Sequence, residues 1–236
     1  KLSLFIFFKL IIIIIMTNFT QMRKNMILGQ FLPASIKNNK ILKSYETLAR
    51  ESFLPNHHKP IAYSDLNLKV TEKRYLPSPL NSAKIFQEAN FSGKEVVLLI
   101  GANYGYEAAI LSSMVETVIA IEEDKKLFNI GQSNCKNLNI ENLIFLNSNH
   151  NNGYKKLGLY DVIISIDLSF DINDELINQL VDKGKIFFCE QHNNEVRESK
   201  LNVIHKSKNG FFKQSLFDIN IPFVKNANNL NDFKFI

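Results

Sequence analysis

The chain has 236 residues, of which 45% are hydrophobic and 22% are charged, and its formal net charge is +5. This length suits one α/β domain with a sizeable core or two small domains, and this composition excludes a disordered chain. Basic residues are scattered, without a basic helix face or a block of basic and aromatic residues, which argues against dedicated nucleic-acid binding.

The first fifteen residues, KLSLFIFFKLIIIII, are almost entirely apolar. Lys9 interrupts the run, which is shorter than the roughly 20 residues that span a bilayer. No small-residue cleavage site of a signal peptide follows it. We expect residues 1–15 to come from translation upstream of a start at Met16, with a membrane anchor as the alternative.

The remaining chain, residues 16–236, is expected to form a single domain. Residues 16–78 would be a subregion of helix and loop, and residues 79–236 would be the core. In the first part, residues 38–49 place their apolar side chains at helical spacing, which predicts an amphipathic helix. The proline-rich stretch that follows predicts a loop with short extended pieces, because proline removes a donor and restricts its predecessor.

The core is predicted to alternate strands with helices. Ser78 and Pro79 are typical of an N-cap and a first helical position, which predicts a helix to about Ala89. Strands are then expected at residues 95–100, 117–121, 142–147, 160–166 and 185–190, and helices at about 106–114, 124–138 and 172–182, the last ending at Gly184. Strands that are apolar throughout indicate a parallel sheet with both faces covered.

Asn209 and Gly210 separate two further strand-like runs and form a strong hairpin signal. A mostly parallel, seven-stranded sheet that ends in an antiparallel hairpin resembles the Rossmann-like class I fold of the S-adenosylmethionine-dependent methyltransferases. We therefore predict this α/β fold class.

The stretch from Val96 to Ser112, VVLLIGANYGYEAAILS, predicts a buried strand, a tight turn and a helix. Gly101 would allow the sharp turn, and Gly105 would let the backbone approach a ligand closely. Asn103 occupies the middle position of a G-x-G-x-G loop, where asparagine tolerates positive φ. Tyr106 departs from the dinucleotide pattern G-x-G-x-x-G, so a nicotinamide-dependent oxidoreductase is disfavoured.

Glu122 lies 21 residues beyond Gly101, at the expected tip of the next strand. A carboxylate there can accept both ribose hydroxyl groups of a nucleotide-like ligand. The alternative is a solvated acidic cluster with Glu123 and Asp124 at a helix N-terminus.

Cys135 and Cys189 are the two cysteines of the chain, without a metal-ligand spacing. We expect two reduced thiols, no metal site and a cytoplasmic location.

Several segments together resemble the protein-L-isoaspartate O-methyltransferases, in particular their diverged bacterial branch. These are MRKNMILGQFLP, RESFLPNHHKPIAYSD, LIGANYGYEAA, AIEED, YDVIISI and SLFDINIPF, spread over residues 16–236. The resemblance implies methyl transfer from S-adenosyl-L-methionine to the α-carboxyl group of an isoaspartyl residue, as protein repair. The implied partners are isoaspartyl-containing peptides or proteins. We expect no nucleic-acid partner, and no membrane contact unless residues 1–15 are part of the protein.

The resemblance also implies site residues. Cofactor binding would fall to Gly101, Ala102, Asn103, Gly105, Tyr106, Glu122 and Asn149. Tyr63 and Pro77 would border the substrate, and Asp65 and Ser78 would be candidate catalytic residues.

Two positions depart from the family pattern. In YLPSP, Pro77 stands where the family's T-I-S-x-P segment has its serine, and proline has neither a hydroxyl group nor a backbone donor. Ser78 follows one position later, and Asn149 replaces an acidic residue. The leading hypothesis is a methyltransferase of this family; the alternative is a catalytically impaired member that acts as an S-adenosylmethionine-binding or regulatory protein.

Overall fold

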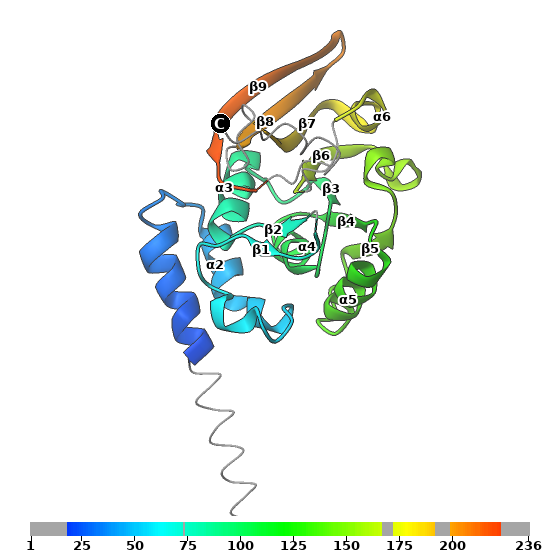
Figure 1. Ribbon diagram of the computed structural model, residues 1–236. Coiled ribbons are helices and arrows are strands. Elements are labelled where there is room, and N and C mark those ends of the chain that lie inside the picture. The colour runs from blue at the N-terminus through cyan, green and yellow to red at the C-terminus, as the bar shows by residue number, and fades with distance from the viewer. Residues whose placement is uncertain (1–17, 73, 167–171, 192–198, 223–236) are drawn as a thin grey trace, which may run out of the picture.

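The structure is a computed structural model that describes residues 18–72, 74–166, 172–191 and 199–222 (Figure 1). The hydrophobic tail expected to be foreign to the fold, residues 1–15, lies outside the described residues. Within the described ranges, no helix is both long enough and apolar enough to cross a membrane.

A seven-stranded sheet forms the centre of the molecule, with the spatial order β5-β4-β3-β6-β7-β8-β9. Its strands are β3 (Val96–Ile100), β4 (Thr117–Glu122), β5 (Leu143–Asn147), β6 (Tyr160–Ser165), β7 (Leu180–Gln191), β8 (Ser199–Ser207) and β9 (Gly210–Ile219). The first five strands of this order pair in parallel, and β7, β8 and β9 pair antiparallel. This arrangement confirms the predicted fold class, including its terminal hairpin.

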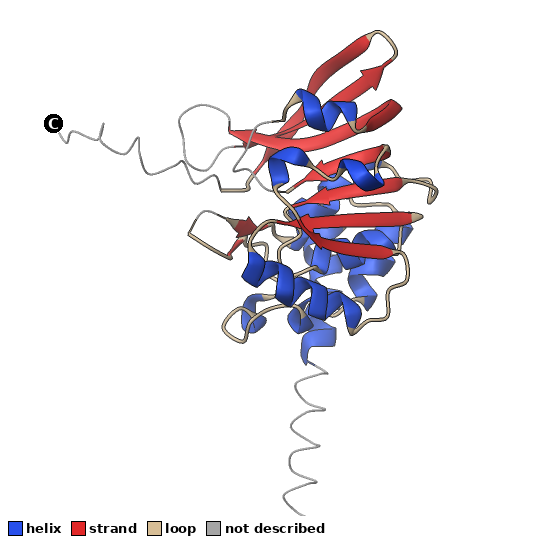
Figure 2. Cartoon of the chain, turned by 90° about the vertical axis from the view of Figure 1, so that its right-hand side faces the viewer, coloured by secondary structure: helices blue, strands red, loops and turns tan. Residues whose placement is uncertain are grey.

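Helices pack against this sheet, as Figure 2 shows. A helix over residues 18–26 continues as the π-helical segment η1 (Ile27–Phe31). It is followed by α2 (Asn39–Thr47), α3 (Pro79–Ala89), α4 (Tyr106–Ser112), α5 (Lys125–Lys136) and α6 (Asp174–Asn178). The proline-rich segment contains the short helices η2 (Arg50–Ser52) and η3 (Lys59–Ile61). It also contains a small hairpin, in which β1 (Leu68–Lys69) pairs with β2 (Tyr75–Leu76). Two further short helices, η4 (His150–Asn152) and η5 (Lys155–Leu157), follow β5.

Helices α2, α3 and α5 begin at side-chain N-caps. The side chains of Asn38, Ser78 and Asp124 accept hydrogen bonds from backbone N–H groups in the first turns of α2, α3 and α5. These bonds satisfy donors that a helix leaves unpaired at its start. The N-cap predicted at Ser78 is therefore confirmed.

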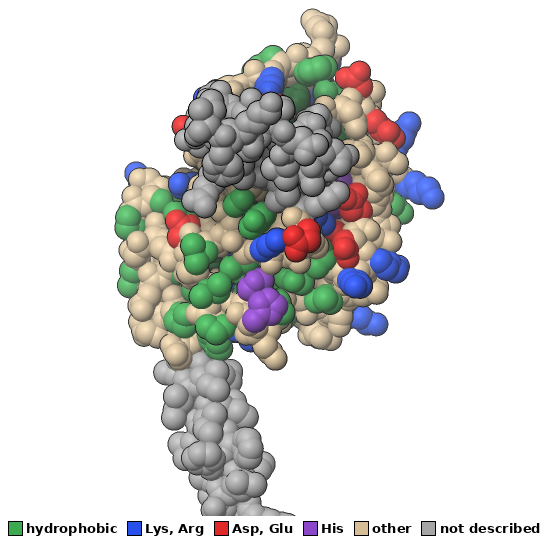
Figure 3. All heavy atoms as spheres, in the orientation of Figure 1, with side chains coloured by type: hydrophobic (Ala, Val, Ile, Leu, Met, Phe, Trp, Pro, Cys, Tyr) green, Lys and Arg blue, Asp and Glu red, His purple; other side chains and the backbone are tan. Residues whose placement is uncertain are grey.

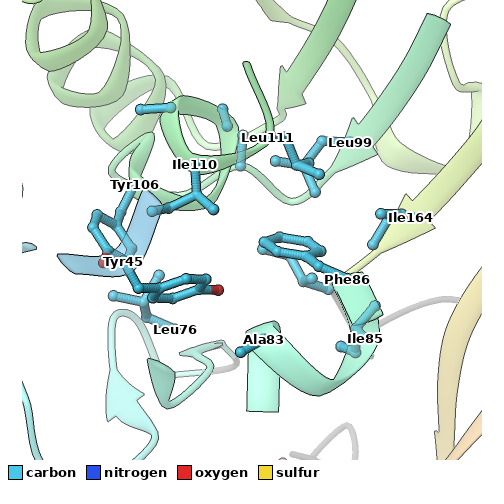
Figure 4. Close-up of a cluster of buried hydrophobic side chains, with 14 of the residues drawn as sticks. Tyr45, Leu76, Ala83, Ile85, Phe86, Leu99, Tyr106, Ile110, Leu111 and Ile164 are labelled. Atoms are coloured by element: carbon cyan, nitrogen blue, oxygen red, sulfur yellow. The ribbon is translucent and has the colours of Figure 1, made fainter. Parts of the chain in front are cut away.

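Strand β3 is buried on both faces, as a parallel sheet covered by helices requires. Val97 and Leu99 belong to a large hydrophobic core on one face, and Leu98 and Ile100 belong to a second core on the other. The large core also contains residues from the N-terminal helices and α3, which Figure 4 shows packed against the sheet and α4. The N-terminal subregion and the Rossmann-like part thus share one core.

The predicted helix over residues 172–182 is wrong in its second half. Helix α6 ends at Asn178, and β7 begins at Leu180, which pairs with Tyr160. The register then jumps, so that Val162 pairs with Lys185 and residues 181–184 form a bulge. The turn-forming residues before Gly184 therefore interrupt a strand instead of ending a helix.

The topology places a switch point at the centre of the sheet. Strand β3 lies between β4 and β6, so successive crossovers leave it in opposite directions. Ligands of open α/β sheets bind beyond the carboxyl ends of the strands at such a switch point. There the glycine turn follows β3, and Glu122 is the last residue of β4.

Candidate functional site

The turn between β3 and α4 has the backbone conformation that its sequence predicts. Gly101, Asn103 and Gly105 have φ values of 81°, 49° and 90°. Asn103 therefore takes the left-handed conformation, as expected at this position. Its side-chain Nδ2 donates to the carbonyl oxygen of Gly101 over 2.8 Å, which stabilises the turn internally.

Gly105 has a packing role that was not predicted. A Cβ atom added there would lie 2.6 Å from Sγ of Cys135 and 3.0 Å from the carbonyl oxygen of Gly131, both on α5. The missing side chain thus lets α5 pack closely against the turn. The close packing of α5 is thus one reason for this glycine, and the expected close approach of its backbone to a ligand stays a prediction.

Glu122 ends β4 directly beside the turn, and its side chain has no exposed surface. The backbone N–H of Asn103 donates to Oε2 over 2.8 Å, and that of Asp124 donates to Oε1 over 2.9 Å. The side chain of Asn147 donates to the Glu122 carbonyl oxygen over 2.7 Å. The alternative of a solvated acidic cluster is therefore wrong for Glu122, because its carboxylate is fixed inside the switch-point crevice.

Arg74 is the residue of this site that sequence reasoning missed. Its guanidinium group forms a bidentate ion pair with the Glu122 carboxylate. Nη1 donates to Oε1, and Nη2 donates to Oε2 over 2.9 Å. Nη2 also donates to Oδ1 of Asn103 over 3.1 Å. Arg74 lies 48 residues before Glu122, so no local pattern links the two.

His150 rather than Asn149 faces this acidic end of β4. Asn149 is exposed, and its side chain caps η4 by accepting from the N–H of Asn151. His150 is 1% exposed, its Nε2 accepts from the N–H of Glu123 over 3.1 Å, and it lies 3.9 Å from Oε1 of Glu122. The part in cofactor binding that the resemblance implies for Asn149 stays a prediction.

Two predicted cofactor residues, Ala102 and Tyr106, are held by contacts within the protein. The N–H of Ala102 donates to the carbonyl oxygen of Ile121 over 3.1 Å, which ties the turn to β4. The ring of Tyr106 packs edge-on against Tyr45 and Phe53, and burial raises the pKa of its phenol well above the ordinary value. Figure 4 shows Tyr106 beside Tyr45 in the core. The ring of Tyr106 thus belongs to the core, and its predicted part in cofactor binding stays a prediction.

Ser78 and Asp65, the two candidate catalytic residues, lie together. The Ser78 hydroxyl donates to Oδ1 of Asp65 over 2.7 Å and accepts from the N–H of Asn81 over 3.2 Å. Ser78 is fully buried, whereas Asp65 is exposed. The serine thus caps α3 and orients a carboxylate at the surface.

Pro77 and Tyr63, the predicted substrate residues, both contact Arg50. Nη2 of Arg50 donates to the Pro77 carbonyl oxygen over 2.8 Å, and the Arg50 N–H donates to the Tyr63 hydroxyl over 3.1 Å. The same hydroxyl donates to Glu51, and burial together with this bond raises the pKa of Tyr63. Tyr63 and Pro77 therefore belong to the buried wall behind the Ser78–Asp65 pair.

Arg50 itself is fully buried and pairs with a second buried charge. Its Nη1 lies 3.5 Å from Oε1 of Glu107 on α4, and both side chains have no exposed surface. Burial raises the pKa of Glu107, and the neighbouring Arg50 opposes that rise. The guanidinium also lies over the ring of Tyr106, 5.0 Å from its centre.

The described residues contain no group of three His, Cys, Asp or Glu side chains that could hold a metal ion. Both cysteines are unbridged and buried, and burial raises the pKa of each thiol to about 12. On the face drawn in Figure 3, basic and acidic side chains are interspersed.

A family model and several known proteins similar to this chain have the same description. The family model of Protein-L-isoaspartate(D-aspartate) O-methyltransferase matches residues 22–229. The protein-L-isoaspartate O-methyltransferase of Helicobacter pylori (strain G27) is 32% identical over 156 residues, which are 66% of this chain and 75% of the relative. That of Protochlamydia amoebophila (strain UWE25) is 27% identical over 161 residues, 68% of this chain and 77% of the relative.

Solved structures agree on the fold. A protein-L-isoaspartate O-methyltransferase matches with a TM-score of 0.75 and 21% identity, covering 86% of this chain and 66% of that one. A Plasmodium falciparum protein of the same description, solved in complex with S-adenosyl-L-homocysteine, matches with a TM-score of 0.71 and 20% identity, covering 88% of this chain and 99% of that one. With the family match over residues 22–229, the chain belongs to the protein-L-isoaspartate(D-aspartate) O-methyltransferase family.

Proposed function

We propose that this protein transfers a methyl group from S-adenosyl-L-methionine to the α-carboxyl group of isoaspartyl residues in peptides or proteins. Membership of the family supports this reaction. The observation that carries it is the placement of Glu122: its carboxylate ends β4 and accepts the Asn103 N–H of the glycine turn over 2.8 Å. This pairs an acid with a tight turn at the switch point of the sheet.

The donor set of this crevice fits the cofactor. Glu122 would accept the two ribose hydroxyl groups, and the left-handed turn at Gly101 and Asn103 would pass beneath the ligand. In the observed arrangement Arg74 holds the same carboxylate oxygens, so the fit requires its guanidinium to move.

When bound, S-adenosylmethionine supplies a methyl group on a positively charged sulfonium. The acceptor is a carboxylate, which is ionised at neutral pH and needs no general base. The protein's task is therefore to align the acceptor oxygen and to exclude water. Asp65 and Ser78 are proposed to border the acceptor, with Tyr63 and Pro77 forming the wall behind them.

Pro77 removes the hydroxyl group that the family places at its position. The Ser78 hydroxyl does not replace it in the observed arrangement, because it is buried and already donates to Asp65. Positioning of the acceptor carboxylate would then rest on backbone N–H groups, because the like-charged Asp65 carboxylate has no hydrogen to donate to it. We accordingly propose slow but specific methyl transfer, in the cytoplasm.

The test is methyl transfer to an isoaspartyl peptide, with the peptide that contains an ordinary aspartyl residue as its matched control. The proposal expects radioactive methyl incorporation into the isoaspartyl peptide alone. Incorporation into neither peptide, combined with measurable binding of S-adenosylhomocysteine, would instead favour a regulatory protein that kept only the cofactor site.

A further inference from the structure

The Glu122 carboxylate is saturated by protein donors. Oε1 accepts from Nη1 of Arg74 and from the N–H of Asp124, and Oε2 accepts from Nη2 of Arg74 and from the N–H of Asn103. A carboxylate has about four lone-pair positions, so these four donors fill them. Glu122 is 0% exposed and Arg74 is 7% exposed. A ligand hydroxyl group therefore cannot reach Glu122 while Arg74 is in place.

The geometry points to an autoinhibitory latch in which the Arg74 guanidinium occupies the ribose subsite. This inference rests on the proposed function, because it assigns the same carboxylate to the cofactor. The cofactor and Arg74 compete for Glu122, so the cofactor site is open only in molecules whose Arg74 side chain has turned away.

The small β1–β2 hairpin holds Arg74 over the crevice. The backbone N–H of Val70 donates to the Arg74 carbonyl oxygen over 2.9 Å, and Leu76, two residues later, is fully buried. Side chains two positions apart in an extended segment point to the same side, so burying Leu76 directs Arg74 inward as well. The hairpin can stay in place while the long Arg74 side chain rotates.

Opening of the latch breaks the ion pair but does not leave the Glu122 carboxylate without donors. Glu122 keeps the N–H groups of Asn103 and Asp124, and Arg74 gains water. For a buried ion pair, the cost of removing both charges from water offsets much of their attraction, so the closed state is only modestly favoured. The apparent dissociation constant then equals the intrinsic constant divided by the open fraction.

The experiment measures binding of S-adenosylhomocysteine by titration calorimetry, which requires no turnover. The variant Arg74→Ala is expected to bind about 10-fold more tightly than the wild type, or better, since minor states of such equilibria are typically populated at up to about 10%. The matched control is Lys69→Ala, which removes the same charge from the same hairpin. Lys69 is half-exposed and pairs only with Glu72 among the contacts described for it.

Thermal unfolding with and without ligand gives a second readout and verifies folding. If Arg74→Ala does not fold, binding is measured with Arg74→Gln instead, because glutamine keeps a polar side chain without the charged guanidinium group. Equal affinity in the wild type and both Arg74 variants overturns the latch and leaves the proposed function intact. Absence of binding in all variants overturns both. A gain shared by Lys69→Ala also overturns the latch, because general charge removal would then explain it.

Discussion

Ser78 makes two hydrogen bonds with one hydroxyl group, and they serve different purposes. Accepting from the N–H of Asn81 caps α3, while donating to Asp65 orients that exposed carboxylate. Asn38 provides a comparison, because its side chain caps α2 by accepting from Lys40 and Ile41 without a second partner among the described residues. Removing each side chain separates the cap from the orienting bond.

We predict that Ser78→Ala and Asn38→Ala each lower the free energy of unfolding by about 1 kcal/mol, the usual cost of losing an N-cap. Urea unfolding measures this cost. Ser78→Ala alone should raise KM for an isoaspartyl peptide, because Asp65 loses its donor. If both variants show wild-type kinetics, Ser78 is a helix cap and has no part in the substrate site.

At the scale of elements, Arg50 joins three segments that are distant in the chain. It belongs to η2, pairs with Glu107 on α4 and donates to the carbonyl oxygen of Pro77, just before α3. All of these contacts are buried. Removing one charge from such a site leaves the partner as an unpaired buried charge. The resulting loss of stability is larger than the stability that the ion pair itself contributes.

We predict that Arg50→Met lowers the free energy of unfolding by about 3–5 kcal/mol, because Glu107 then remains as an unpaired buried charge. The double variant Arg50→Met, Glu107→Gln should recover part of this loss. A double-mutant cycle from urea unfolding measures the coupling. Additivity of the two single changes within about 0.5 kcal/mol would show that the pair does not couple the elements.

At the scale of the whole molecule, the two buried thiols make stability depend on alkaline pH. Burial raises the pKa of Cys135 and of Cys189 to about 12. In the unfolded chain a thiol ionises near pH 8.5. Above that pH the unfolded state loses protons that the folded state keeps, so stability falls as pH rises toward 12.

We predict that Cys189→Ala flattens this decline by about 1.4 kcal/mol per pH unit between pH 9 and 12, the slope of one proton. The measurement is the difference in unfolding free energy between variant and wild type across that window, which cancels the other titrating groups. A difference that does not change with pH would contradict a buried neutral thiol at this position.

The elements that sequence reasoning found correctly are those with local causes. The cap Ser78, the positive φ of Asn103 and the hairpin at Gly210 each depend on a few consecutive residues. The helix expected to end at Gly184 failed because Leu180 pairs with Tyr160, and that pairing outweighs the turn chemistry of residues 181–184.

The sequence by itself determined the alternation of buried strands and helices, and with it the sheet and the glycine turn that bring Glu122 to the switch point. Only the tertiary structure decided what surrounds them. Gly105 makes room for α5, and Arg74 forms an ion pair with Glu122, although the two residues are 48 positions apart in the sequence. Periodicity and capping act within one or two turns of chain, whereas these contacts form only when packing brings distant segments together.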